Sequence, residues 1–343
     1  MTQAPITRSQ PHEVPREDRA LRPVTLSEFI GQERAVANLR LAMQAATERH
    51  EVLDHLLLSG PPGLGKTTLA HLVATEMGRA IREVAGPAIG KPGDLAGILS
   101  SLLPGQVLFI DEIHNLKREI AEFLYSAMED FRITVPIGEK ASGSTVNLTL
   151  NPFTLIGATT RKGRLPTPFR SRFVLQERLQ LYSDEDMARI LARSAQRLQM
   201  ASTVEALTTI AARSRGTARI GNAYLRRVRD VAQVHHDGVL TLAAVEEGMR
   251  YLGIDDRGLC ELDRRILQCL ARTHRPVGLK TIAGAVHEEE MTIEDTYEPW
   301  LMQQGMLIKA PSGRVIMPPG RAHLTSLGLH PAMPPVRGAV PIW

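Results

Sequence analysis

Residues 56–68 read LLLSGPPGLGKTT, and this stretch determines the fold that we expect for the chain. An apolar run typical of a buried strand leads into a glycine-rich turn, and a helix-forming segment follows at once. The pattern matches G-x-x-x-x-G-K-[ST] between a strand and a helix. Glycines let backbone N–H groups curl around phosphates, and the helix N-terminus adds the positive end of its dipole. The stretch therefore predicts a nucleotide-binding site in which Lys66 reaches the β- and γ-phosphates and Thr67 ligates Mg²⁺.

Composition excludes several other classes of protein. The chain has 343 residues, of which 43% are hydrophobic and 23% charged, and its net charge is only +4. These values are ordinary for globular chains of two or three domains, and they exclude a protein that is strongly basic over its whole length. Cys260 and Cys269 are the only cysteines, so a disulfide scaffold and a zinc ribbon are excluded as well. No apolar run approaches about 18 residues and the N-terminus is polar, so we expect a cytoplasmic protein without a membrane span.

Strands that alternate with helices predict an α/β fold with a parallel sheet. Residues 107–110 and 153–158 are apolar runs, and each ends in polar residues: Asp111-Glu112 after the first and Thr159-Thr160 after the second. Because sites in such folds lie at the carboxyl ends of the strands, we expect these residues to gather beside Lys66. Asp94 is the expected N-cap of a helix over 94–103.

The remaining organisation follows from changes in pattern along the chain. Strand patterns cease after residue 183, and a Gly- and Asp-rich stretch at 253–258 suggests another boundary. The last part shows three short helices and a hairpin, which is typical of a winged helix. We expect these segments: a disordered lead-in at 1–20, a large nucleotide-binding domain at 21–183 with a β-hairpin at about 133–150, a small helical domain at 184–256, a winged helix at 257–330 and a flexible tail at 331–343.

A division of labour between two carboxylates predicts hydrolysis and not only binding. Asp111 is expected to hold Mg²⁺ through water, while Glu112 polarises the water that attacks the γ-phosphate. Thr160 could sense the γ-phosphate, although strand-end threonines also satisfy backbone groups. Arg172 could act as an arginine finger, stabilising charge on the transferring phosphoryl group in a neighbouring subunit's site, or it could be an ordinary surface arginine. His114 could couple hydrolysis to movement or could simply be a polar residue at a helix start.

Charge on the last domain suggests how it would meet DNA. Its expected recognition helix carries acidic residues at 294, 295 and 298, which would repel phosphate. Basic residues gather instead on the hairpin, at Lys309 and Arg314. We therefore expect sequence-independent contact with the DNA backbone through the wing. A winged helix that binds protein is the alternative.

With these residues in view, the chain resembles the RuvB family, the bacterial Holliday-junction branch-migration motors of the AAA+ ATPases. The motifs that carry the resemblance cover about residues 21–318 in order and include LDHLLLSGPPGLGKTTLA, GPAIGKPGDLAGIL, VLFIDEIHNL, AMEDF, NPFTLIGATTR and TIEDTYEPWL. The resemblance implies a homohexameric ring with ATP and Mg²⁺ as cofactors, acting on duplex DNA at four-way junctions with RuvA as its partner.

The resemblance also assigns residues to sites. It implies a catalytic group of Lys66, Asp111, Glu112, Thr160 and Arg172, with Thr67 and Asp111 at the Mg²⁺. It implies docking of RuvA on the hairpin at 133–150 and DNA contacts at Lys309 and Arg314. The nucleotide-binding positions that it implies are Leu21, Arg22, Gly63, Gly65, Lys66, Thr67, Thr68, Glu129, Asp130, Phe131, Arg172, Tyr182 and Arg219.

Several positions depart from the family pattern. Lys309 replaces a usual wing arginine, Ser312 replaces a second, and Ala218 replaces a proline before Arg219. The stretch FRSRFV at 169–174 lacks the acid between its two arginines and the following glycine that the family carries. None of these changes touches Lys66, Asp111 or Glu112. The alternative is a clamp-loader-like or remodelling ATPase whose winged helix binds protein, or a RuvB relative with another partner. A third possibility is a nucleotide-gated DNA-binding regulator with little turnover. Glu112 argues against it, because binding alone needs no carboxylate that activates water.

Overall fold

The computed structural model describes residues 20–136, 145–273 and 275–329. The chain divides into two compact units, residues 1–200 with 216–222, and residues 201–215 with 223–343. Among the described residues, no helix is long and apolar enough to cross a membrane.

The first unit is built on a five-stranded parallel sheet with strand order β2-β3-β6-β1-β7. This confirms the predicted α/β fold. The strands are β1 (Leu56–Ser59), β2 (Ile81–Ala85), β3 (Val107–Asp111), β6 (Thr154–Thr159) and β7 (Leu175–Arg178). The central strands β1 and β6 are buried at every position, as expected where helices cover both faces.

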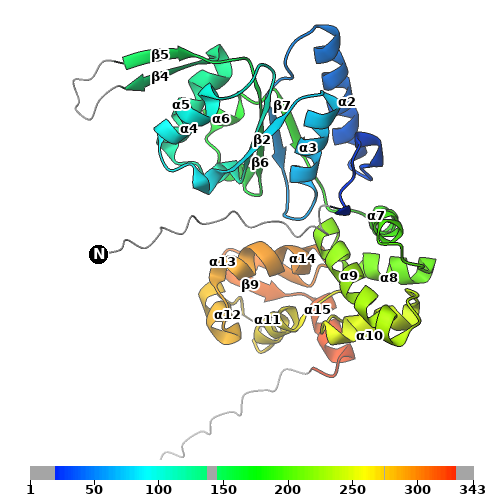
Figure 1. Ribbon diagram of the computed structural model, residues 1–343. Coiled ribbons are helices and arrows are strands. Elements are labelled where there is room, and N and C mark those ends of the chain that lie inside the picture. Colours follow the sequence, from blue (N-terminus) through cyan, green and yellow to red (C-terminus); the bar gives the residue numbers. More distant parts are fainter. Residues whose placement is uncertain (1–19, 137–144, 274, 330–343) are drawn as a thin grey trace, which may run out of the picture. The chain divides into compact units, whose positions relative to one another are not determined.

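Helices lie on both faces of this sheet, with α2 and α3 on one side and α4 and α5 on the other (Figure 1). The helices of the unit are α2 (Glu33–Glu48), α3 (Lys66–Glu76), α4 (Pro92–Ser100), α5 (Arg118–Asp130), α6 (Thr167–Arg170) and α7 (Asp184–Arg197). The core between the sheet and α4–α5 is mainly aliphatic, with Phe153, Phe169 and Phe173 as its buried rings.

The predicted N-cap of α4 is wrong. The helix begins at Pro92, and Asp94 is its third residue. From there its carboxylate accepts hydrogen bonds from the amides of Gly90 and Lys91, at 3.2 and 3.1 Å. The acid therefore satisfies backbone donors before the helix, because proline is well suited to the first helical position and starts the helix earlier.

A separate antiparallel hairpin follows α5. Its strands are β4 (Arg132–Pro136) and β5 (Thr145–Thr149), paired from Arg132 opposite Thr149 to Pro136 opposite Thr145. The hairpin predicted at about 133–150 is thus present, but its turn at 137–144 lies outside the described residues.

The second unit is mainly helical and ends in the predicted winged helix. Its elements are α8 (Val204–Arg213), the greater part of α9 (Ala218–His235), α10 (Leu242–Tyr251), α11 (Glu261–Ala271), α12 (Leu279–Val286), α13 (Glu290–Thr292), α14 (Glu298–Gln303), β8 (Leu307–Ala310), β9 (Gly313–Ile316) and α15 (Pro318–Ser326). The apolar core of the winged helix draws on α11, α12, α14 and the two strands. A π-helical stretch, Ile293–Tyr297, separates α13 from α14. Because Pro299 at the start of α14 has no N–H to donate, the regular hydrogen-bond ladder is interrupted there.

Candidate nucleotide site

The phosphate-binding loop leaves the carboxyl end of β1, as the sequence predicted. Gly60 has φ +140°, and a Cβ at this position would lie 2.5 Å from the carbonyl oxygen of Leu179. Gly65 has φ +92°, and a Cβ there would press against the Phe29 ring at 3.3 Å. Side chains would therefore disrupt the loop at both positions. Helix α3 begins at Lys66, so that Lys66 and Thr67 stand in its first turn.

The Lys66 ammonium is buried in this loop. Its Nζ donates hydrogen bonds to the carbonyl oxygens of Gly60 and Pro61, both at 2.8 Å. Burial lowers the pKa of Lys66, and the nearby carboxylates of Glu112 and Asp111 offset part of that effect. The charge is thus held by oxygen acceptors, which are the kind of group that a phosphate also presents.

The two predicted carboxylates lie at the carboxyl end of β3, the second strand along from β1 in the sheet. Burial raises the pKa of Asp111, whose Oδ1 accepts a hydrogen bond from the amide of Glu112 at 3.0 Å. Glu112 has φ +48°, which turns the chain sharply after the strand. Gly86 makes room for that turn, since a Cβ on it would lie 2.6 Å from the Glu112 carbonyl oxygen.

Glu112 is positioned by the end of the neighbouring strand β6. Its Oε2 accepts from the Thr160 hydroxyl at 3.2 Å and from the Thr160 amide at 3.4 Å. The same oxygen lies 3.1 Å from Nδ1 of His114. That nitrogen is also 2.9 Å from the hydroxyl of Thr159, a fully buried residue whose carbonyl oxygen accepts from the amide of Gly60. The predicted acid, the strand-end threonines and the phosphate loop therefore form one connected network, and His114 belongs to it.

A pocket opens beside the loop, and its lining includes five of the residues that the resemblance assigned to nucleotide binding: Leu21, Arg22, Gly65, Thr68 and Tyr182. The hydroxyl of Tyr182 donates to the carbonyl oxygen of Leu64 at 2.9 Å, and the amide of Arg219 donates to that of Gly63 at 3.3 Å. The residues that line the pocket are Leu21, Arg22, Pro23, Phe29, Ile30, Gly65, Thr68, Tyr182, Ile190, Arg193, Ala218 and Asn222. Phe29, Ile190, Arg193 and Asn222 were not predicted, because no motif distinguishes them from ordinary helix or loop residues.

Arg172 and the segment Glu129–Phe131 lie at the opposite end of the sheet from Lys66. Arg172 precedes the amino end of β7, while the phosphate loop follows the carboxyl end of the parallel strand β1. Its guanidinium forms an ion pair with Glu129 at 3.0 Å and lies 4.8 Å from the centre of the Tyr125 ring. Phe131 and Arg172 also border a groove of about 630 Å³ at this edge. The fold thus separates these four residues from the Lys66 site of the same chain.

The two predicted DNA-contacting residues are paired with acids on the neighbouring helix. Nζ of Lys309 lies 2.8 Å from oxygens of both Glu294 and Glu298. Nε of Arg314 lies 2.6 Å from Glu298, whose side chain is only 1% exposed. The acidic helix that the sequence suggested would repel DNA therefore also neutralises the basic wing.

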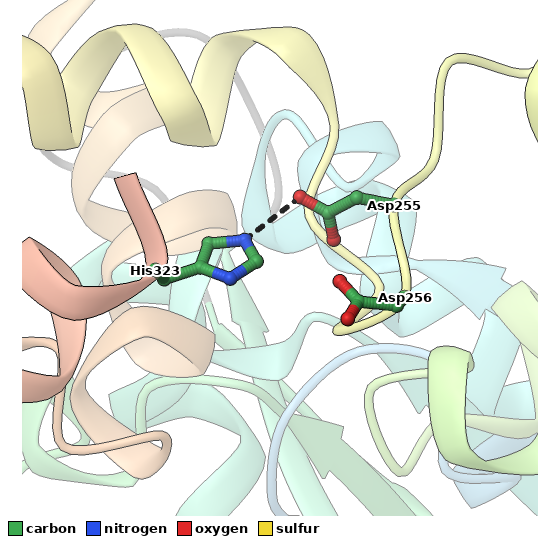
Figure 2. Close-up of side chains that lie close together, drawn as sticks. All are labelled: Asp255, Asp256 and His323. Carbon is green, nitrogen blue, oxygen red and sulfur yellow. Dashed lines mark hydrogen bonds and ion pairs between the residues drawn. The ribbon is translucent and has the colours of Figure 1, made fainter. Parts of the chain in front are cut away.

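One group of His and Asp side chains among the described residues is close enough to share a metal ion (Figure 2). Nε2 of His323 lies 3.0 Å from Oδ2 of Asp255, and Asp256 lies beside them. The guanidinium of Arg264 sits 3.3 Å from the same Oδ2 atom, and Oδ1 of Asp255 accepts from the amides of Arg257 and Leu259. The Arg264 guanidinium already supplies the positive charge that a metal ion would bring to the Asp255 carboxylate. We therefore interpret this cluster as a structural contact that joins α15 to the segment before α11.

Family models match three successive segments of the chain. Residues 21–179 match the Holliday junction DNA helicase RuvB P-loop domain, residues 182–255 the RuvB AAA lid domain, and residues 256–325 the RuvB C-terminal winged helix domain.

Relatives are similar over most of both chains. A Holliday junction branch migration complex subunit RuvB from Methanoregula boonei is 52% identical over 90% of this chain and 92% of its own. Its counterpart from Anaeromyxobacter is 47% identical over 94% and 96%. The Thermotoga maritima RuvB Holliday junction branch migration motor superposes with a TM-score of 0.80 at 44% identity, covering 89% of this chain and 98% of that structure.

Proposed function

This chain belongs to the RuvB family, and we propose that its ATP site is completed by an adjacent copy of the same chain in a homohexameric ring. As a member of that family it is an AAA+ ATPase that drives branch migration of Holliday junctions in DNA recombination and repair. The proposal concerns how the described residues divide that work.

The position of Glu112 is the observation that carries the hydrolytic assignment. A carboxylate held by Thr160 and His114, in the network that also anchors the phosphate loop, is suited to orient and deprotonate an attacking water. Asp111 is a half-buried carboxylate with a raised pKa, so a nearby dication would favour its charged form. We assign Mg²⁺ to Thr67 and, through water, to Asp111; the ion would neutralise charge on the phosphates.

Arg172 supports the shared site. An arginine at the far end of the sheet from its own phosphate loop is suited to reach a neighbour's nucleotide, and Glu129, Asp130 and Phe131 lie on the same edge. In the proposal, the finger of one subunit stabilises charge on the phosphoryl group held by Lys66 of the next. Leu21, Arg22, Tyr182 and Arg219 hold the remainder of the nucleotide.

The partner assignments rest on two surfaces. On the hairpin, Val146 and Leu148 are exposed apolar side chains two residues apart on β5, hence on one face, which is suited to docking a protein such as RuvA. On the winged helix, Lys309 and Arg314 are assigned to duplex DNA.

The proposed domains are the large nucleotide-binding domain at 21–183, the small helical domain at 184–256 and the winged helix at 257–330. The proposed location of the protein is the cytoplasm.

Dissociation of a synthetic four-way junction tests the function. We expect ATP-dependent dissociation that RuvA stimulates and that Lys66→Ala abolishes, because this variant loses the ammonium at the phosphates. ATP hydrolysis without junction dissociation, unaffected by RuvA, would contradict the proposed partner and would favour a relative that serves a different complex. Retained ATP affinity in Lys66→Ala would contradict the site itself.

A further inference from the structure

Arg215 and Asp263 form a buried ion pair in the second unit. The guanidinium contacts both oxygens of the carboxylate, with Nη1 at 3.4 Å from Oδ1, and its Nε donates to the carbonyl oxygen of Gly258 at 2.9 Å. Asp263 is fully buried and Arg215 nearly so. Oδ2 of Asp263 also accepts a hydrogen bond from the amide of Cys260, at 2.8 Å. The side chain of Arg215 is therefore fixed by α11 and by the segment before it.

The backbone at Arg215 has an unfavourable conformation. Its φ is +53°, a left-handed value that is costly for a residue with a Cβ. Gly216 follows with φ +61°; a Cβ there would lie 2.9 Å from Cβ of Leu181, and its carbonyl oxygen accepts from the amide of Tyr182 at 2.9 Å. A strained non-glycine residue persists only where its surroundings hold it, and such residues cluster at functional sites. The contacts of the Arg215 guanidinium supply that hold.

The residues that follow Arg215 reach the phosphate loop. The division between the two units falls between residues 215 and 216, and residues 216–222 belong to the first unit. Within that segment, the amide of Arg219 donates to the carbonyl oxygen of Gly63 at 3.3 Å. A Cβ on Gly63 would lie 3.0 Å from Cβ of Arg219, so the arginine packs directly on the loop. The buried ion pair thus stands at the start of a short segment that carries a residue of the nucleotide site.

We infer that the ion pair of Arg215 with Asp263 positions Arg219 in the ATP site. The guanidinium holds residue 215 in its left-handed conformation, and this fixes the direction in which the chain enters the segment that carries Arg219. The inference rests on the proposed nucleotide contact of Arg219, and it makes ATP affinity depend on a carboxylate of α11. Arg215 and Asp263 are positioning residues, which act on the nucleotide only through Arg219.

A charged pair suits this role better than apolar packing does. Two apolar side chains of similar volume often give equal stability, because removing two charges from water offsets much of their mutual attraction. Apolar side chains fix no direction, whereas a planar guanidinium bound to a carboxylate and a carbonyl oxygen has a defined geometry. An apolar replacement of both residues should therefore preserve the fold and remove the positioning.

Replacement of both charges separates positioning from stability. Arg215→Met combined with Asp263→Leu, the apolar pair, should have a thermal unfolding midpoint close to that of the unmodified protein. We expect it to weaken ATP binding about tenfold, measured as a dissociation constant by competition against a fluorescent nucleotide. In an Arg219→Ala background the apolar pair should cause no further loss of ATP affinity, because the residue that the ion pair positions is then absent.

Arg213→Met combined with Glu246→Leu is the matched control. It removes another two-point ion pair of the second unit, with contacts of 2.6 and 3.2 Å between α8 and α10. Arg213 is as buried as Arg215, at 7% and 8% exposed, but φ is not left-handed at Arg213. We expect this control to leave ATP affinity unchanged, with and without Arg219.

The comparison of the two backgrounds decides the inference. An equal loss of ATP affinity with and without Arg219 would overturn it, because the ion pair would then act on the protein independently of Arg219. Unchanged ATP affinity in the apolar pair would overturn it as well. If the apolar pair does not fold, Asp263→Asn keeps the volume and one acceptor oxygen, and it is measured in the same two backgrounds by the same criteria. Unchanged ATP affinity in Arg219→Ala alone would instead refute the proposed nucleotide contact, and the inference with it.

Discussion

Nζ of Lys309 on the wing lies 2.8 Å from Oε2 of Glu298, a carboxylate that is almost completely buried. Arg314 contacts the other oxygen of the same carboxylate at 2.6 Å. The two basic residues assigned to DNA therefore also have a structural task, because each compensates a charge that has been removed from water. Their contributions to DNA binding and to stability must be separated by experiment.

Arg314→Ala should destabilise the winged helix as well as weaken DNA binding. The substitution leaves the buried Glu298 with Lys309 as its remaining partner, and we expect a loss of about 2 kcal/mol in the free energy of unfolding. Thermal unfolding followed by circular dichroism measures the loss, and junction binding is measured at several salt concentrations. Lys280→Ala is the matched control, because it removes an exposed positive charge from the same domain. Unchanged stability of Arg314→Ala would show that Glu298 does not depend on this pair.

Thr160→Val should slow ATP hydrolysis about tenfold with little change in ATP affinity. The variant removes the hydroxyl that donates to Glu112 and leaves the longer contact from the Thr160 amide and the contact with His114, so the carboxylate is held less firmly. Glu112→Gln should lower turnover much further, by about 10²- to 10⁴-fold, since the base itself is lost. Phosphate release and nucleotide binding are measured in parallel, with Thr208→Val on α8 as the control. Normal hydrolysis by Glu112→Gln would remove this residue from the mechanism.

Mixed rings should reveal whether Arg172 acts in the neighbouring subunit. Arg172→Ala and Glu112→Gln are each expected to be inactive alone, whereas a mixture should regain ATPase activity, because some interfaces then combine an intact finger with an intact base. Tyr125→Leu should impair the finger in the same assay by removing the ring beside the guanidinium, and Tyr125→Phe should retain it. Absence of rescue at every mixing ratio would contradict a shared site.

The sequence predicted the parts of the fold that carry local signals. A short apolar run such as Leu56–Ser59, and glycines at the fixed spacing of the phosphate loop, are each compatible with only a few local backbone structures. The edge strands Ile81–Ala85 and Leu175–Arg178 were not predicted, because their sequences, IREVA and LQER, are short and show no strand pattern, and they gain their pairing from β3 and β1. Local propensity does not contain that information.

The candidate site shows the same limit. Lys66, Asp111 and Glu112 follow strands within motifs, and their meeting could be predicted from parallel-sheet topology. Asn222 and the pairing of Lys309 with Glu298 have no motif, since each depends on side chains brought together by the tertiary fold. Residues of this second kind become visible only when burial and hydrogen-bond partners are known.

His55 illustrates such a residue. It precedes β1, and its ring accepts a hydrogen bond at Nδ1 from the amide of Leu155, at 2.9 Å. The other nitrogen, Nε2, lies 3.1 Å from the carbonyl oxygen of Met128 and must therefore carry the hydrogen. This arrangement requires the neutral ring. It also joins the sheet to the end of α5, one residue before the Glu129 that pairs with Arg172.

Stability should therefore fall in mild acid because of His55. Burial lowers its pKa below the ordinary value of about 6.5, although the hydrogen bond to Met128 acts in the opposite direction. Below about pH 6.5 the unfolded chain takes up a proton at this residue while the folded chain does not, so the unfolded state gains stability as the pH falls toward the lowered pKa. One such group changes the free energy of unfolding by at most about 1.4 kcal/mol per pH unit.

Comparison with His55→Asn isolates this contribution, since asparagine keeps an acceptor for the Leu155 amide but does not titrate. We expect the variant to be less stable at pH 8, where it loses the bond to Met128 and the ring contact with Phe153, yet to lose less stability between pH 7 and pH 5.5. The other histidines titrate in both proteins and cancel in the difference. Chemical denaturation at each pH measures the two slopes. Equal slopes would mean that His55 becomes protonated within the fold, and the neutral-ring assignment would then be wrong.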